Sequence, residues 1–339
     1  MSRRRVHEAY DETDVRVRPG RGSRPRSKIR PKHEDAEAGF VIAVDRGRLT
    51  CIVGADERTI TAMRARELGR KGVVVGDRVD LVGDTSGREG SLARIVRVHD
   101  RTTVLRRTAD DDDPVERIIV ANADQMVIVT SVIDPEPRPR LIDRSLVAAY
   151  DAGLDPLLCI TKTDLADPAE LRAIYGPLGV PTLESGLDVE PETLMIRLRD
   201  RASVLVGHSG VGKSTLVNLL VPGADRATGE VNVVTGRGRH TSASAVALPL
   251  PGEKGRFSGW IIDTPGIRSF GLAHVDPNHL IHAFPDLDAE TAECPRGCTH
   301  GAAEPECALD DAVLAGRLDP ARVDSYRRLL ASRQRRAGD

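Results

Sequence analysis

Residues 203–215, Ser-Val-Leu-Val-Gly-His-Ser-Gly-Val-Gly-Lys-Ser-Thr, decide the fold of this chain. An apolar run enters the spacing Gly207-x-x-x-x-Gly212-Lys213-Ser214, and a helical pattern of leucines and valines follows. This order of strand, glycine-rich loop and helix is the context in which such a loop binds the phosphates of a nucleotide. A glycine-rich turn that binds nothing is the alternative, but the motif and its context agree on a phosphate site.

Each residue type in this loop has a physical role. The glycines let the backbone point successive N–H groups at a phosphate, and the helix that follows directs its positive dipole end to the same place. The Lys213 ammonium can reach the β- and γ-phosphates, and the Ser214 hydroxyl can ligate Mg²⁺. The expected phosphate-binding residues are Gly207, His208, Ser209, Gly210, Val211, Gly212, Lys213, Ser214 and Thr215.

The whole chain has the composition of an ordinary soluble protein with several domains. It has 339 residues, of which 29% are charged and 40% hydrophobic, with a net charge of −2. No apolar run approaches the roughly 20 residues that span a bilayer, and the N-terminus carries charge without an apolar segment. We therefore expect a cytoplasmic monomer that has no membrane partner.

Strands alternate with helices around the phosphate loop, between residues 114 and 271. This pattern predicts a doubly wound sheet of buried parallel strands. The expected strands are Ile118–Val120, Met126–Thr130, Pro156–Ile160 and Val180–Leu183, and the expected helices are Arg140–Ala152 and Pro168–Tyr175.

A second motif, Thr161-Lys162-Thr163-Asp164, directly follows one of these strands. An aspartate at the carboxyl end of a parallel strand can accept two hydrogen bonds from the N1–H and N2–H₂ edge of guanine. A helix cap is the alternative, since Thr and Asp are favoured there. A phosphate loop in the same sheet favours guanine recognition, with Lys162 packed along the ring. Ser185 lies in the loop after the next strand and is expected to touch the base through its backbone.

A third motif, Asp263-Thr264-Pro265-Gly266, ends the buried strand Gly259–Ile262. We expect Asp263 to hold Mg²⁺ through water and the Gly266 N–H to meet the γ-phosphate. The Gly-, Ser- and Thr-rich stretch before this strand, residues 228–245, has the composition of a mobile loop. Within it, we expect the Thr241 hydroxyl to close on Mg²⁺ and the γ-phosphate, with Ser242 or Thr235 as alternatives.

The order of the motifs is unusual. Base recognition precedes phosphate binding, and the metal strand comes last, whereas ordinary guanine-nucleotide switches place base recognition at the end. The same sheet can be built either way, because chain termini often lie close enough for circular permutation. Residues 114–271 are thus expected to form a circularly permuted P-loop GTPase domain.

Short alternating strands separated by turns precede this domain, over residues 38–109. Their spacing predicts a small closed barrel of the oligonucleotide-binding type. Aromatic residues are scarce, so an RNA contact would be to backbone and shape rather than to stacked bases; a purely structural barrel is the alternative. The expected strands are Phe40–Val44, Leu49–Val53, Thr59–Ala62, Val79–Leu81 and Leu92–Val98.

Residues 1–37 are expected to form a disordered basic tail. The first 33 residues hold eleven Lys and Arg against four Asp and Glu, with few large apolar side chains. Such a segment is either a solvated tail or an arm that binds a polyanion through counterion release. The tail alone does not decide between the two.

The last 68 residues, 272–339, carry a cysteine cluster. Cys294, Cys298, His300 and Cys307 form a closed set of four ligands, which predicts one structural zinc ion in a helical domain. A disulfide with two leftover ligands is the alternative, and a cytoplasmic location argues against it. A helix from Pro320 to Arg336 follows, rich in arginine, and is a plausible contact for an RNA backbone.

From residue 38 onward the chain resembles a bacterial family, the ribosome-small-subunit-dependent GTPase A, which is a circularly permuted GTPase. The resemblance is carried by the barrel, the three nucleotide motifs in permuted order, Arg239-His240-Thr241 and the zinc set. It implies binding to the small ribosomal subunit and its 16S rRNA in late maturation, GTP hydrolysis stimulated by the ribosome, and release. Two positions depart from the pattern: Thr161 replaces a frequent Asn, and the zinc spacing is Cys-x3-Cys-x-His-x6-Cys.

Catalysis should lie in positioning and charge stabilisation by Lys213, Thr241 and His240. Ile267 follows the metal motif where switch GTPases of the Ras type carry a water-orienting Gln, so we expect slow intrinsic hydrolysis. His240 is the candidate to orient water, although a solvated loop histidine is the alternative. A different reading of the whole chain is an RNA-binding zinc protein that uses GTP as a structural or regulatory ligand for another partner.

Overall fold

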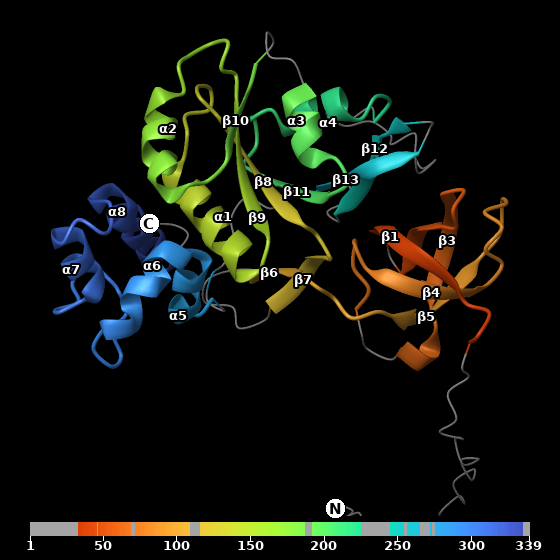
Figure 1. Ribbon diagram of the computed structural model, residues 1–339. Helices are drawn as coiled ribbons and strands as arrows, with labels where there is room; N and C mark the ends of the chain where they lie inside the picture. Colours follow the sequence, from red (N-terminus) through yellow and green to blue (C-terminus); the bar gives the residue numbers. More distant parts are fainter. Residues whose placement is uncertain are drawn as a thin grey trace, which may run out of the picture. The chain divides into compact units, whose positions relative to one another are not determined.

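The computed structural model describes residues 33–45, 47–68, 72–108, 116–186, 192–224, 245–253, 256–264, 272 and 275–334. Figure 1 shows the arrangement of these elements. The described strands form one eleven-stranded sheet and a separate two-stranded sheet. No helix in the described ranges combines the length and the apolar character needed to cross a membrane.

Five strands near the N-terminus close into a barrel. Strand β1 pairs antiparallel with both β2 and β4, and β5 joins β4 to β3. Alternate residues along β2 and β4 are buried, as expected for strands with one face toward a core. The predicted barrel is confirmed. The strands are β1 (Glu37–Asp45), β2 (Arg48–Val53), β3 (Arg58–Arg64), β4 (Arg78–Gly83) and β5 (Ala93–Val98), with a 3₁₀ turn at Arg66–Leu68.

The central domain is a sheet with helices on both faces. Its strands run in the order β10-β9-β8-β11-β13 and are all parallel, and β12 pairs antiparallel with β13. The strands are β8 (Gln125–Ser131), β9 (Asp155–Thr161), β10 (Thr182–Ser185), β11 (Ala202–Val206), β12 (Val246–Pro251) and β13 (Phe257–Asp263). The helices are α1 (Pro139–Asp151), α2 (Ala169–Tyr175), α3 (Glu192–Leu198) and α4 (Lys213–Leu220), with a 3₁₀ turn at Gly176–Leu178.

Strand β8 shows how the two faces are covered. All of its residues are buried. Met126 and Ile128 belong to the core that contains residues of α1 and α2, whereas Val127 and Val129 belong to the core that contains residues of α3 and α4. Because successive side chains of a strand point to opposite faces, the two helix pairs lie on opposite sides of the sheet. The predicted doubly wound sheet is confirmed.

One predicted strand of this sheet is wrong. The run Ile118–Val120 lies in β7 (Glu116–Ala121), which pairs antiparallel with β6 (Val104–Thr108) in the separate two-stranded sheet. Ile118 and Ile119 are only half-buried. A run of three apolar residues fits a short hairpin strand as well as a buried parallel one, and its pattern alone could not separate the two.

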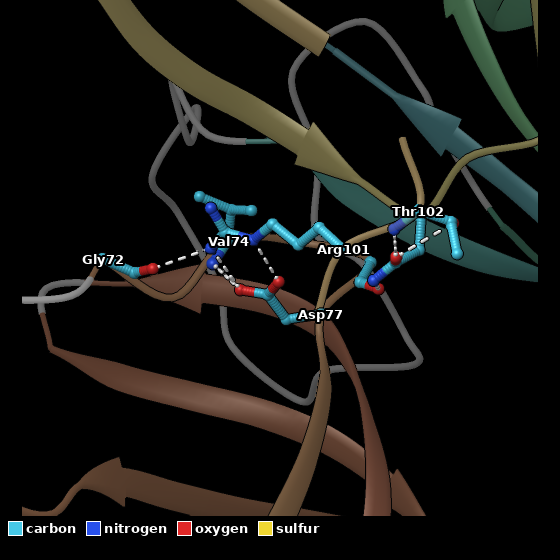
Figure 2. Close-up of polar contacts among 7 residues, drawn as sticks. Gly72, Val74, Asp77, Arg101 and Thr102 are labelled. Carbon is cyan, nitrogen blue, oxygen red and sulfur yellow. Dashed lines mark hydrogen bonds and ion pairs between the residues drawn. The ribbon is translucent and has the colours of Figure 1, made fainter. Parts of the chain in front are cut away.

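A polar junction joins the barrel to the residues that follow it, as Figure 2 shows. The Arg101 guanidinium donates hydrogen bonds to both carboxylate oxygens of Asp77, which is fully buried, at 2.7 and 2.8 Å. The Asn122 amide donates to the Gly76 carbonyl at 2.9 Å. Gly76 has a φ of +90°, and an added Cβ would lie 1.8 Å from the Ala121 oxygen. Only glycine fits this close approach.

The barrel and the central sheet are also continuous through one pair of strands. Ala43 of β1 pairs with Val246 of β12, so β12 lies between the barrel and β13. The rings of Phe40 and Trp260 meet beside this pairing at 5.0 Å. The sequence did not predict β12, because Val246–Pro251 follows a stretch with the composition of a loop and itself contains proline.

The C-terminal part is helical, as predicted. Its helices are α5 (Pro277–Leu280), α6 (Pro285–Glu290), α7 (Ala308–Leu314) and α8 (Pro320–Gln334), with 3₁₀ turns at Ile281–Ala283 and Thr291–Glu293. Helix α8 packs on α1 of the central domain. There the Arg328 guanidinium pairs with the buried Asp143 carboxylate at 3.2 Å, and Arg144 donates to the Ser332 carbonyl at 3.1 Å.

The suggested RNA contact of this helix needs correction for three of its arginines. Arg322 pairs with Asp286, Arg327 with Asp310, and Arg328 with Asp143. These guanidinium groups therefore pack α8 against its own chain rather than waiting for a phosphate. The side chain of Arg333, together with Arg335 and Arg336, lies outside the described residues.

Candidate functional site

The motifs found in the sequence lie at one edge of the central sheet. Residues 161–164 end β9, Ser185 ends β10, residues 207–212 follow β11, and Asp263 ends β13. These strands are parallel neighbours, with β8 between β9 and β11. Their carboxyl ends therefore share the edge at which ligands of such sheets bind.

The phosphate loop is a tight turn against β8. Gly207 has a φ of +148°, and a Cβ at this position would lie 2.3 Å from the Val129 oxygen. Any side chain would therefore push the loop off the sheet. Gly212 caps helix α4, which begins at Lys213 as predicted. Ser209, Gly210, Ser214 and Thr215 are exposed, so this surface is open to a ligand.

The Lys213 ammonium lies in the concave side of the loop. It donates hydrogen bonds to the carbonyl oxygens of Gly207 at 2.5 Å and His208 at 2.7 Å. Burial lowers the pKa of Lys213 to about 8. A desolvated ammonium held by two neutral carbonyls can be stabilised further by an anion, and phosphate oxygens are the anions that such a loop attracts.

His208 has a structural place in the loop. Its side chain is buried, and Nδ1 lies 2.9 Å from the carbonyl oxygen of Ser209. Burial lowers the pKa of His208, and the positive charges of Arg138 and Lys213 act in the same direction. The imidazole is therefore neutral at pH 7, and Nδ1–H donates to the backbone oxygen.

Thr161, the first residue of the base motif, faces the phosphate loop. Its hydroxyl lies 2.6 Å from the Val211 oxygen and 3.1 Å from the Thr130 oxygen, and the residue is 6% exposed. A Cβ at Gly212 would lie 3.6 Å from the same hydroxyl. The side chain thus connects β8, β9 and the loop, which the sequence alone did not show.

The rest of the base motif lies beside the loop after β10. The Thr163 N–H donates to the Ser185 oxygen at 3.4 Å. Asp164 is exposed, and its Oδ1 would lie 2.8 Å from a Cβ at Gly186. The structure thus places Asp164 and Ser185 together, at the end of the sheet edge that is expected to receive the base.

The sequence analysis missed the connection between β8 and α1. The Lys162 ammonium donates to the Asp134 carbonyl, and the Ser131 hydroxyl donates to the Pro135 carbonyl at 2.6 Å. Pro135 also lies 3.4 Å from a Cβ built at Gly210. Residues 131–135 therefore bridge the base motif and the phosphate loop. Their position after a strand flanked by two motif-bearing strands was the signal in the sequence.

We predict that Thr161→Val weakens GTP and GDP binding alike. The change leaves the Val211 carbonyl without its donor, which costs about 1 kcal/mol, or about 5-fold in affinity. Thr161→Ser keeps the hydroxyl and should bind as the wild type does, whereas Thr182→Val removes a hydroxyl that contacts only the Val180 oxygen and serves as the control. Titration of a fluorescent nucleotide measures all three; unchanged affinity in Thr161→Val would contradict the role.

The strand that carries Asp263 is tied to the phosphate loop strand. The Thr264 hydroxyl donates to the Leu205 oxygen at 2.9 Å, and Asp263 is 8% exposed. The rest of the proposed γ-phosphate machinery lies outside the described residues. This applies to Gly266 and Ile267, to His240 and Thr241, and to the alternatives Thr235 and Ser242.

The C-terminal cysteine cluster is a candidate metal centre. The ligand atoms of Cys294, Cys298, His300 and Cys307 all lie within 4.8 Å of one another. The three sulfurs lie 3.5, 3.6 and 3.9 Å from His300 Nδ1. A tetrahedral zinc ion with Zn–S of about 2.3 Å and Zn–N of about 2.0 Å separates sulfur from nitrogen by about 3.5 Å. The donor set therefore fits one such ion.

Backbone groups support thiolates at this centre. The Ala308 N–H donates to Cys294 Sγ and the His300 N–H donates to Cys298 Sγ, both at 3.4 Å. Burial raises the pKa of the Cys298 thiol to about 11, and burial lowers the pKa of His300. A divalent cation reverses the first effect, because it favours the deprotonated sulfur, so loading of this centre releases protons.

Comparisons with known proteins agree with this geometry. The model of the RsgA GTPase family matches residues 98–273. A curated relative from Chlorobaculum parvum, named small ribosomal subunit biogenesis GTPase RsgA, is 38% identical over 287 residues. That match covers 81% of this chain and 90% of the relative.

Two solved structures share the fold. The crystal structure of YjeQ from Thermotoga maritima superposes with a TM-score of 0.64 at 26% identity, covering 88% of this chain and 99% of that one. The structure of YloQ, titled a circularly permuted GTPase, superposes with a TM-score of 0.63 at 22% identity, covering 90% and 98%. The predicted circularly permuted fold is therefore confirmed.

Proposed function

Because the chain belongs to the RsgA GTPase family, we propose that it hydrolyses GTP while bound to the maturing small ribosomal subunit, and that hydrolysis drives its release. The observation that supports this most is the convergence of Lys213, Thr161 and Asp164 at one edge of a permuted sheet. A loop with a phosphate-facing lysine and a loop with an exposed carboxylate are the two halves of a guanine-nucleotide site.

In this proposal the described residues bind and orient the nucleotide. Backbone N–H groups of residues 207–215 and the Lys213 ammonium hold the phosphates, and Asp164 accepts from the guanine edge. Lys162 and Ser185 border the base. Mg²⁺ would be held by the Ser214 and Thr241 hydroxyls, with Asp263 acting through water, and would stabilise charge on the phosphate oxygens.

We further propose that the cysteine cluster holds one structural zinc ion. Four protein ligands leave no open coordination position, which argues for a structural centre rather than a catalytic one. Cytoplasmic location, a monomeric state and contact with 16S rRNA are part of the same proposal. A non-catalytic RNA-binding protein with GTP as a regulatory ligand for another partner is the competing hypothesis.

GTP turnover with and without purified small ribosomal subunits tests this function. We expect slow turnover of the isolated protein and many-fold stimulation by subunits. Binding of the GTP-loaded protein to subunits should weaken as salt rises, because phosphate contacts release counterions. Equal turnover with and without subunits would support the competing hypothesis.

We predict that Asp164→Asn changes the preferred base. An amide presents an N–H where guanine also presents N–H groups, and the loss of two charge-assisted hydrogen bonds costs about 3 kcal/mol, or about 100-fold in GTP affinity. Xanthosine triphosphate carries a carbonyl at that edge and should bind the variant better than GTP. Competition between the two nucleotides measures the preference. Asp167→Asn, which changes an exposed carboxylate on the same loop, should keep the preference for guanine.

We predict that His240→Ala keeps GTP affinity and lowers subunit-stimulated turnover by about 100-fold, a typical contribution of a positioned proton-accepting group. Single-turnover hydrolysis on saturating subunits measures the effect. His279→Ala removes an exposed histidine of the C-terminal part and provides the control. Stimulated turnover that survives in His240→Ala would discard the catalytic assignment.

A further inference from the structure

Helix α8 presents an unpaired hydroxyl next to the cysteine cluster. Tyr326 is fully buried, and its hydroxyl has no hydrogen-bond partner among the described residues. Its ring packs edge-on against Phe284 at 5.5 Å. Burial is the main cause that raises the pKa of this hydroxyl, and the Cys307 and Cys298 sulfurs raise it further. Both sulfurs therefore lie close enough to act on it.

The next residue of α8 brings a positive charge to the same cluster. The Arg327 guanidinium donates to the His300 carbonyl at 3.3 Å and makes two hydrogen bonds to Asp310 at 2.8 and 2.9 Å. These bonds to Asp310 are the main cause that raises the pKa of Arg327, and the Cys307 sulfur acts in the same direction. The side chain is 13% exposed, so water screens it little.

The chemistry of the donor set explains both neighbours. Three thiolates and one neutral imidazole around a divalent cation carry a net charge of −1. A buried negative centre is stabilised by a nearby cation and by O–H or N–H donors to its sulfurs. The Tyr326 hydroxyl lacks an acceptor, and a thiolate is a better acceptor than a protonated thiol.

We propose that Tyr326 and Arg327 are positioning residues of the metal centre, the first as a hydrogen-bond donor to a metal-bound sulfur of Cys298 or Cys307 and the second as its compensating charge. This inference rests on the metal assigned under the proposed function. Helix α8 also pairs with α1 through Arg328 and Asp143. Loading of the centre therefore strengthens the docking of α8 on the GTPase domain.

The test compares full-length variants with matched controls. Tyr326→Phe removes only the hydroxyl, and Tyr150→Phe removes another buried hydroxyl whose ring also contacts Phe284, at 5.0 Å. Arg327→Gln removes the charge beside the cluster, and Arg322→Gln removes one from the same helix that pairs with Asp286 instead. Metal affinity is measured by competition of Zn²⁺ with a chromophoric chelator, and the sulfur environment by the charge-transfer band of the Co²⁺-loaded protein.

We expect Tyr326→Phe and Arg327→Gln to weaken Zn²⁺ binding by about 10-fold or more, as outer hydrogen-bond partners of metal ligands do. The sulfur-to-Co²⁺ band should move to longer wavelength in Tyr326→Phe, because its loss leaves the sulfur electrons higher in energy. Arg327→Lys, which keeps the charge, should recover part of the affinity. Tyr150→Phe and Arg322→Gln should match the wild type.

Two results would overturn the inference: metal affinity and band position unchanged in Tyr326→Phe and Arg327→Gln, or equal losses in the two control variants, which would indicate a general packing effect. A wild-type protein that binds neither Zn²⁺ nor Co²⁺ is a different result. It would refute the metal centre of the proposed function itself and the inference with it.

Discussion

The substitution Lys213→Ala is expected to lower the affinity for GTP and GDP about 100-fold. The Lys213 ammonium is held at the loop by two backbone carbonyls, and alanine has no group that can replace it. Losing charge-assisted hydrogen bonds to phosphate oxygens costs about 3 kcal/mol. Titration calorimetry with each nucleotide measures the loss.

The control for this experiment removes a charge from the other end of the same strand. Arg201 precedes β11 and pairs with the exposed Asp155 carboxylate at 2.8 Å, so Arg201→Ala should bind nucleotide normally. If Lys213→Ala binds GTP as tightly as this control, the phosphate site is assigned to the wrong loop.

The same lysine gives the wild type an expected pH dependence. The pKa of Lys213 is lowered by burial to about 8 in the nucleotide-free protein, and bound phosphate must raise it. The favourable interaction is therefore complete below pH 8 and is lost as the pH rises above it. Binding measured from pH 7 to 9.5 should weaken progressively, and Lys213→Ala should lose this dependence.

The substitution Cys307→Ser is expected to unfold the C-terminal part of the chain around the metal centre. Cys307 is almost fully buried at the start of α7. Structural zinc in small folds contributes on the order of 10 kcal/mol, which is comparable to the whole stability of a domain. We expect loss of the bound metal and fast amide exchange in residues 275–334, with the exchange of β8, β9 and β11 little changed.

The matched control is Cys51→Ala, since Cys51 is an equally buried thiol in the barrel, far from the cluster in sequence. This variant loses side-chain volume but should retain one metal ion per chain. Chelation of the wild type should reproduce the exchange pattern of Cys307→Ser. Protection of residues 275–334 that persists without metal would show that the helices are held by packing alone.

Predictions of local features agreed with the structure wherever one stretch of sequence contains its own physical cause. The loop between β11 and α4 could be placed from glycine spacing, since only glycine permits its backbone and only a strand and a helix give it a phosphate-binding geometry. The barrel strands could be placed from alternation and turn residues. Ile118–Val120 was assigned wrongly because three apolar residues do not reveal which strand pairs with them.

By itself, the sequence determined the permuted order of the nucleotide motifs, the barrel before them and the cysteine set after them, because each depends on residues near one another in the chain. Only the tertiary structure decided which partners the side chains find. Thr161 contacts Val211 rather than an open base site, and Arg328 pairs with Asp143, 185 residues away, rather than with RNA. The reason is that burial and hydrogen bonding between distant segments depend on how the sheet and helices pack, and no local pattern records that.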